Sequence, residues 1–150
     1  MTMSDVDAIN ALAARYSDAA ARLDGVAAAA VYAEDGVLMA FSGPEIVGRP
    51  AIEQALKLTL EPLDFLSQQC TGGMITVDGD RALARWNVQE WTRKTGEELL
   101  SCCFGMYEDE VVRTAAGWRF SRRRFHPFYR GRVEGQSRLY ERPVYEHPEL

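Results

Sequence analysis

The chain has 150 residues, of which 47% are hydrophobic and 26% are charged. This length fits one compact domain, and the composition excludes an intrinsically disordered chain, which would combine few apolar residues with a high net charge. The net charge of -5 conceals an asymmetry, because residues 1–112 carry 18 acidic and 8 basic side chains whereas residues 113–150 carry 9 arginines and 4 glutamates. Overall acidity argues against nucleic acid as a partner, so we expect these arginines to pair with the acidic remainder or with a second subunit.

Charged residues interrupt the first thirty positions, so no apolar segment there is long enough for a signal peptide or a membrane span. Three cysteines, Cys70, Cys102 and Cys103, show neither a CxxC pair nor a metal-ligand spacing with histidine. We therefore expect a cytoplasmic protein with reduced cysteines, without a metal site and without membrane association.

Three helices are predicted in the first part of the chain. Apolar or small residues recur at helical spacing over about residues 5–23, and Ser4 begins a pattern that resembles a capping box. Asp24 can cap a second, shorter helix that extends to Ala33, where the sequence EDG ends it. A third amphipathic helix is predicted from Pro50 to the sequence EPLD, because Pro62 disfavours helix at the residue before it.

The remainder of the chain is predicted to form strands. A short apolar strand covers residues 37–41, and the turns VDGD, TGEE and AAGW separate four long strands between residues 65 and 129. Helices followed by strands indicate an α+β fold, with three N-terminal helices packed on one face of a curved, mostly antiparallel sheet. We expect the domain to span residues 1–130, with residues 131–150 as a tail that forms no domain of its own.

Four phrases follow one another in an order that resembles the SnoaL-like group of the nuclear transport factor 2-like superfamily. They are ALAARYSDAAARLDGVAAAAVYAEDGVL, VGRPAIEQAL, ITVDGDRALARW and YEDEVVRTAAGWRFSRRRF, within residues 6–125. The resemblance implies a cystatin-like cone with a deep pocket between helices and sheet, and a homodimer formed through the outer sheet face. It also implies acid–base chemistry on small cyclic apolar substrates without metal or organic cofactor, as in ketosteroid isomerase, scytalone dehydratase, polyketide cyclase and bile-acid dehydratase.

Three positions show how the chain compares with the catalytic residues of the family: one tyrosine matches them, and two other positions differ. Tyr16 matches the tyrosine that donates to the oxyanion in ketosteroid isomerases, although a core tyrosine with a backbone partner is the alternative. Ala40 stands where the isomerases carry a proton-shuttling aspartate, and Gln68 stands where SnoaL-like dehydratases usually carry a histidine. Neither side chain can accept a proton near neutral pH, so the usual base of both enzyme classes is missing.

Asp35 and His126 are the acid–base candidates that remain. Asp35 matches a widespread aspartate at a helix-to-strand junction, where it can meet a pocket base or accept hydrogen bonds from local amides. By strict alternation His126 shares a strand face with Trp118, Phe120 and Arg124, which places Arg124 and His126 at the pocket mouth if the two aromatic rings face the helices. A bulge would reverse this parity, and a surface histidine is the alternative.

Seven side chains are expected to contact the substrate or to wall its cavity. They are Trp86, Glu90, Phe104, Met106, Arg124, Gln68 and Tyr32. Tryptophan and methionine at a period of two are equally typical of an ordinary sheet core. Glu90 needs a partner if it faces the interior, and Arg124 or His126 could supply one.

Three hypotheses about function follow. The first is a cofactor-free lyase or isomerase that acts on a small cyclic apolar molecule, with Asp35 and His126 as the acid–base pair and Tyr16 as hydrogen-bond donor. The second is a non-catalytic ligand-binding or accessory protein that keeps the pocket but lacks the usual base. The third is an interaction module in which the sheet face and the basic tail form a dimer or a hetero-complex without any ligand; it requires a pocket that is filled by Trp86, Met106 and their neighbours.

Overall fold

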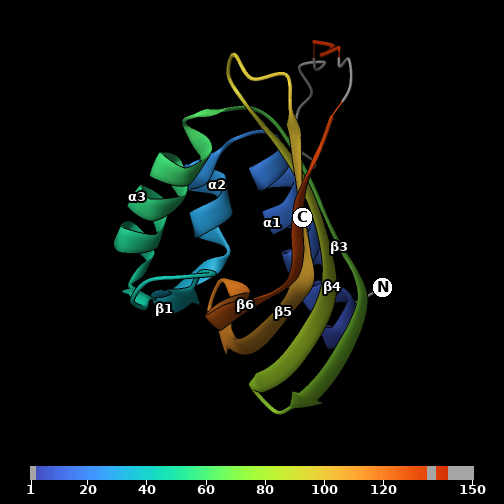
Figure 1. Cartoon of the computed structure of the whole chain (residues 1–150). Helices are drawn as coiled ribbons and strands as arrows, with labels where there is room; N and C mark the ends of the chain where they lie inside the picture. The colour runs from blue at the N-terminus through green and yellow to red at the C-terminus, as the bar shows by residue number, and fades with distance from the viewer. Residues whose placement is uncertain (1–2, 135–137, 142–150) are drawn as a thin grey trace.

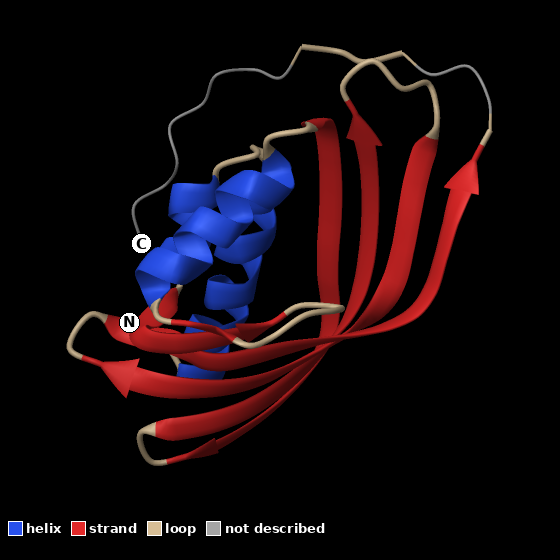
Figure 2. Cartoon of the chain, turned by 60° about the vertical axis from the view of Figure 1, so that its left-hand side comes forward, coloured by secondary structure: helices blue, strands red, loops and turns tan. Residues whose placement is uncertain are grey.

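The computed structural model describes residues 3–134 and 138–141. Three helices pack on the concave side of one curved sheet (Figures 1 and 2). The elements are α1 (Asp5–Ala21), α2 (Gly25–Ala30), β1 (Tyr32–Met39), β2 (Ile46–Val47), α3 (Arg49–Leu60), β3 (Leu63–Asp78), β4 (Arg81–Lys94), β5 (Leu100–Thr114) and β6 (Gly117–Val133). This architecture confirms the predicted α+β fold. None of the described helices combines the length and the apolar composition that a membrane span requires.

The sheet has the strand order β2-β1-β6-β5-β4-β3. All neighbouring strands pair antiparallel except β1 and β6, which run parallel. The three long hairpins β3–β4, β4–β5 and β5–β6 therefore follow the predicted turns, and the short strands β1 and β2 extend the sheet beyond β6. Because the sheet curves around the helices, its concave face forms the core and its convex face remains outside (Figure 2).

Side chains cap the first two helices as the sequence predicts. The Ser4 hydroxyl accepts a hydrogen bond from the Asp7 amide at 3.2 Å, and the Asp24 carboxylate accepts one from the Ala27 amide at 2.9 Å. The second helix ends at Ala30, three residues earlier than predicted. The chain leaves the helix there because Tyr32 already pairs with Phe120 on β6, so β1 begins before the predicted strand start.

Two bulges in β6 decide which of its side chains face the helices. Val111 pairs with Phe120 and Glu110 pairs with Arg122, so Ser121 has no partner in the register, and the same shift recurs at Phe128. Each extra residue reverses the parity of the side chains that follow. The inward set is therefore Trp118, Phe120, Arg123, Phe125, Pro127, Arg130 and Arg132. The prediction that Arg124 and His126 face the pocket is wrong for this reason.

The register of β5 corrects a second prediction. Tyr107 pairs with the buried Trp86, and Cys103 pairs with Glu90, so these residues of β5 face the helices. Phe104 and Met106 alternate with them and lie on the outer face, where Phe104 stacks on Tyr129 at a centroid distance of 5.8 Å. The prediction that Phe104 and Met106 wall the cavity is therefore wrong. Both faces of β5 carry apolar side chains, so alternation alone could not distinguish them.

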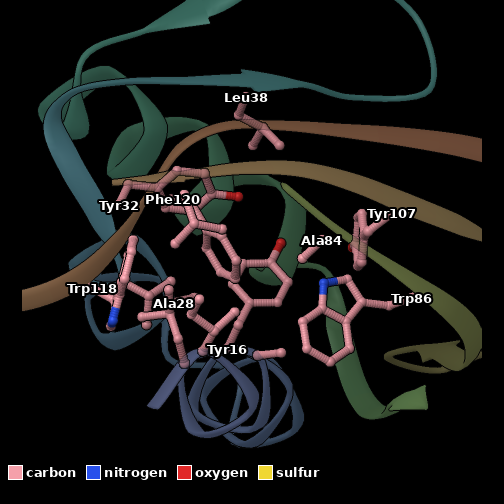
Figure 3. Close-up of a cluster of buried hydrophobic side chains, with 14 of the residues drawn as sticks. Tyr16, Ala28, Tyr32, Leu38, Ala84, Trp86, Tyr107, Trp118 and Phe120 are labelled. Carbon is pink, nitrogen blue, oxygen red and sulfur yellow. The ribbon is translucent and has the colours of Figure 1, made fainter. Parts of the chain in front are cut away.

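The core contains a buried arginine surrounded by aromatic rings. Arg123 is fully buried and forms two hydrogen bonds with the Asp109 carboxylate, at 2.8 Å from Nε and 2.7 Å from Nη2. Trp86 donates to the same carboxylate at 2.8 Å. The guanidinium carbon lies 4.0 Å from the Tyr107 ring centroid and 4.5 Å from that of Tyr16. Figure 3 shows the Tyr16, Tyr107 and Trp86 side chains directed toward one another in this part of the core.

The predicted boundary at residue 130 falls inside β6, which continues to Val133. Of the predicted tail, residues 134 and 138–141 are described and form no helix or strand. Residues 135–137 and 142–150, including His147, lie outside the described residues.

Candidate functional site

A cavity of about 570 Å³ lies between the helices and the end of the sheet that carries the β4–β5 hairpin. All three helices and strands β3 to β6 contribute to its lining. Its apolar side chains include Ala20, Ala28, Leu56, Leu60, Pro62, Leu63 and Leu66. A volume of this size accommodates a small organic molecule, and the apolar lining favours a hydrophobic one.

The floor of the cavity consists of two rows of side chains that run across four adjacent strands. The register pairs the inner row as Gln68, Glu90, Cys103 and Arg130, and the outer row as Leu66, Thr92, Ser101 and Arg132. All eight side chains line the cavity. The inner row therefore runs from an amide through a carboxyl and a thiol to a guanidinium group, and the outer row runs from an apolar side chain through two hydroxyls to a guanidinium group.

Glu90 is the carboxyl group of the inner row. The Gln68 side-chain amide donates to Glu90 Oε2 at 2.8 Å and to the Tyr107 hydroxyl at 3.2 Å. Burial raises the pKa of Glu90, and the hydrogen bond from Gln68 and the charge of Arg130 oppose this rise only in part. A carboxyl whose pKa is raised toward neutrality can both accept and return a proton, which is the property of a general acid–base group.

Tyr16 reaches the same cavity from α1. Burial raises the pKa of the Tyr16 phenol, although the Arg123 charge and a hydrogen bond from Tyr107 act in the opposite direction. The phenol therefore stays protonated at neutral pH and can donate to a bound oxygen. The Tyr107 ring packs edge-to-face on Tyr16 at a centroid distance of 6.0 Å, and its hydroxyl accepts the hydrogen bond from Gln68, so Tyr107 connects the two cavity residues from beneath the floor.

Three of the predicted site residues, Tyr16, Gln68 and Glu90, come together in this cavity. Trp86 and Tyr32 face inward as well but belong to the packed core. The Trp86 indole donates a hydrogen bond to the Asp109 carboxylate, and the Tyr32 ring packs edge-to-face on Tyr16 at a centroid distance of 6.2 Å. The prediction that Arg124 or His126 is the partner of Glu90 is wrong, because Gln68 donates to the Glu90 carboxyl instead.

Asp35 and His126 lie away from the cavity. Asp35 is an exposed residue of β1 that lines a separate hollow on the outer face of the sheet, with Arg122 among its neighbours. His126 pairs across the sheet with Met106 on the outer face, with its Nε2 atom 4.0 Å from Glu108 Oε1. The structure does not bring Asp35 and His126 together with Tyr16.

Several cavity residues have no counterpart among the predicted ones, namely Cys103, Arg130 and Arg132, together with Tyr107 beneath the floor. The pairing of Cys103 with Glu90 could be obtained by counting residues outward from the TGEE turn. Counting from the AAGW turn does place Arg130 and Arg132 on the inward face, because the two bulges cancel in parity, but it misses their cross-strand partners by two residues.

Comparison with protein families finds one match. The family model described as SnoaL-like domain matches residues 1–124, which include most of the residues that line the cavity. A search among curated proteins finds no match.

Solved structures with the same fold belong to proteins that are described in different ways. An NTF2-like protein with a cystatin-like fold from Novosphingobium aromaticivorans is 28% identical, with a TM-score of 0.68 and 81% of this chain and 80% of that chain covered. A ketosteroid isomerase-like protein from Erwinia carotovora is 21% identical, with a TM-score of 0.73 and coverages of 85% and 99%. A type 2 hexachlorocyclohexane dehydrochlorinase is 15% identical, with a TM-score of 0.78 and coverages of 88% and 90%. The latter two establish similarity of fold alone.

Proposed function

Because the chain belongs to the SnoaL-like domain family, we propose that it is a cofactor-free lyase or isomerase that acts on a small cyclic, mostly apolar substrate. The observation that supports this proposal best is the Glu90 carboxyl, which lines an apolar cavity and has a pKa raised by burial. The similarity of fold to a dehydrochlorinase and to an isomerase-like protein is consistent with chemistry of this kind. Fold alone would not support it, since one fold serves many functions.

The cavity residues have distinct roles in this proposal. Glu90 removes a proton from a substrate carbon next to an electron-withdrawing group, and Tyr16 donates to the oxygen on which negative charge develops. Gln68 keeps the carboxyl in position through Oε2. In an elimination, the electron pair of the broken C–H bond forms a double bond as the leaving group departs. In an isomerisation, Glu90 returns the proton to another carbon.

The test compares Glu90 with the two acid–base candidates predicted from sequence. Cyclic ketones and alcohols are screened in D₂O by NMR for elimination or for exchange of carbon-bound hydrogen. With an active compound, we expect E90Q to lower the rate by about 10² to 10⁴-fold and Y16F by about 10² to 10³-fold. D35N and H126A are expected to leave the rate unchanged. The opposite pattern, with E90Q active and D35N or H126A inactive, would return the catalytic role to Asp35 and His126.

A second candidate function is ligand binding without catalysis. It is favoured by Gln68, which occupies the position of the usual histidine and engages one oxygen of Glu90. In this case a ligand binds stoichiometrically and is recovered unchanged, and E90Q alters its affinity but no rate. Recovery of a converted product in a Glu90-dependent reaction would exclude this candidate.

A further inference from the structure

Three cations lie at the mouth of the cavity, and we call them the rim cations. They are Arg130 and Arg132 on β6 and Lys94 at the end of β4, and all three are exposed side chains that line the cavity. Among the described residues, no carboxylate lies within salt-bridge distance of any of the three, whereas Arg93 and Arg122 each have an acidic partner. The rim cations therefore concentrate positive charge at one end of a cavity whose helix side is apolar and whose floor is mostly polar.

The sheet register gives the spacing between these charges and Glu90. Arg130 lies in the same row as Glu90 but two strands away, which corresponds to about 10 Å between the backbones. Arg132 lies in the next row on the same face, about 7 Å nearer the hairpin end. The apolar side chains Leu56, Leu60 and Leu63 line the space that faces these rows. A molecule that reaches both Glu90 and the rim cations thus has roughly the length of one or two rings.

The chemistry of the rim favours a carboxylate. An arginine fork binds a carboxylate through two parallel N–H donors, and two arginines on one face of a strand present such forks side by side. Glu90 must itself ionise to act as a base, and a dianionic group such as a phosphate monoester would oppose that ionisation more strongly than a carboxylate.

We propose that the substrate of this site is a one- or two-ring carboxylic acid whose carboxylate is bound by Arg130 and Arg132, with Lys94 adding to the positive field. Its ring system lies against the leucine side chains, and its reacting carbon lies next to Glu90. This inference rests on the proposed function for the role of Glu90, but the recognition of the carboxylate can be tested without turnover.

The test measures binding of three ligands that share one ring system. Isothermal titration calorimetry is performed with β-naphthoate, its methyl ester and β-naphthyl phosphate on the wild-type chain and on the R130A/R132A variant. The wild type is expected to bind the acid at least about tenfold more tightly than the ester, and the variant to bind both with similar affinity. R85A/R124A is the matched control, because Arg85 and Arg124 are exposed arginines on the outer face. Their loss removes the same number of positive charges without touching the cavity, so the preference for the acid should remain.

The remaining outcomes separate this inference from the proposed function. In one outcome, E90Q retains the preference for the acid over the ester while neither the wild type nor any variant converts a substrate. That result would contradict the proposed chemistry and support the carboxylate site. Equal binding of acid and ester by the wild type, binding of neither, or an unchanged preference in R130A/R132A with a wild-type melting temperature would overturn the inference. Tighter binding of the phosphate than of the acid would overturn the assignment to a carboxylate.

Discussion

The Glu90 carboxyl lies in the cavity with one oxygen bound to the Gln68 amide, and burial raises its pKa. Because the folded-state pKa lies above the unfolded-state value, the folded protein binds this proton more tightly than the unfolded chain does. The penalty for ionising Glu90 is therefore absent below the unfolded-state pKa, grows as the pH rises through both values, and is complete above the folded-state pKa.

This sign leads to a prediction about stability. E90Q, which cannot ionise, should gain stability relative to the wild type as the pH rises from the ordinary carboxyl value of 4.5 toward neutrality. Urea unfolding at a series of pH values measures the difference in the free energy of unfolding between the two proteins. A difference that stays constant over this range would mean that Glu90 has the same pKa in the folded and unfolded states.

The Asp109 carboxylate differs from that of Glu90 because it is the counter-ion of a buried cation, the Arg123 guanidinium, to which it is bound by two hydrogen bonds. D109N leaves that charge without a counter-ion inside the core, so we expect a loss of about 3 to 5 kcal/mol in the free energy of unfolding. D35N makes the same chemical change at an exposed position and should alter stability by no more than about 0.5 kcal/mol. Denaturant unfolding of D109N and D35N measures both changes in the free energy of unfolding. Similar losses in the two variants would contradict the role assigned to Asp109.

At the scale of the element, two bulges in β6 decide which of its side chains face the helices. The bulge at Ser121 reverses the parity between Phe120 and Arg123, and the second bulge at Phe128 restores it before Arg130. The Ser121 hydroxyl donates to the backbone carbonyl of Glu110 at 3.0 Å, which fixes the first bulge to the neighbouring strand. One strand thereby contributes both the core arginine and the rim arginines.

Deletion of Ser121 tests this account of β6. Without the extra residue, the Arg123 side chain would move to the outer face and Asp109 would lose its partner, so we expect a loss of at least about 3 kcal/mol in the free energy of unfolding. S121A keeps the register and removes only one hydrogen bond, which should cost about 0.5 to 1.5 kcal/mol. Equal effects of the deletion and of S121A, measured by denaturant unfolding, would show that the bulge does not set the facing of Arg123.

At the scale of the whole molecule, the helices cover only one face of the sheet (Figure 2). The outer face carries Phe104 and Met106 together with the exposed side chains of Met74 and Leu83. Apolar groups on an uncovered sheet face favour association with another surface. We therefore propose, as the sequence predicts, that the chain forms a homodimer through this face.

The homodimer is tested by a matched pair of substitutions. Leu83 on the outer sheet face and Leu58 on α3 are both 64% exposed, so either can be replaced by glutamate without opening the core. L83E is expected to produce a monomer in sedimentation velocity, because it replaces an exposed apolar side chain of the proposed interface by a carboxylate beside Glu110 on the same face. L58E should retain the mass of the wild type. A monomeric wild type, or a dimer that survives L83E, would contradict the proposed interface.

The sequence by itself determined the three helices, the long hairpins, the α+β class and the family resemblance, because caps, turns and apolar periods act over a few neighbouring residues. It also identified Tyr16, Gln68 and Glu90, which the structure brings together in one cavity. Only the tertiary structure decided which face each side chain of β5 and β6 occupies. That choice depends on bulges and on the pairing of Asp109 with Arg123, which are non-local interactions that leave no periodic signal. His126 was expected in the cavity because strict alternation takes no account of the bulge at Ser121, whereas Asp35 was expected there from the family resemblance. The positions of the rim arginines relative to Glu90 became visible only once the strands were in register.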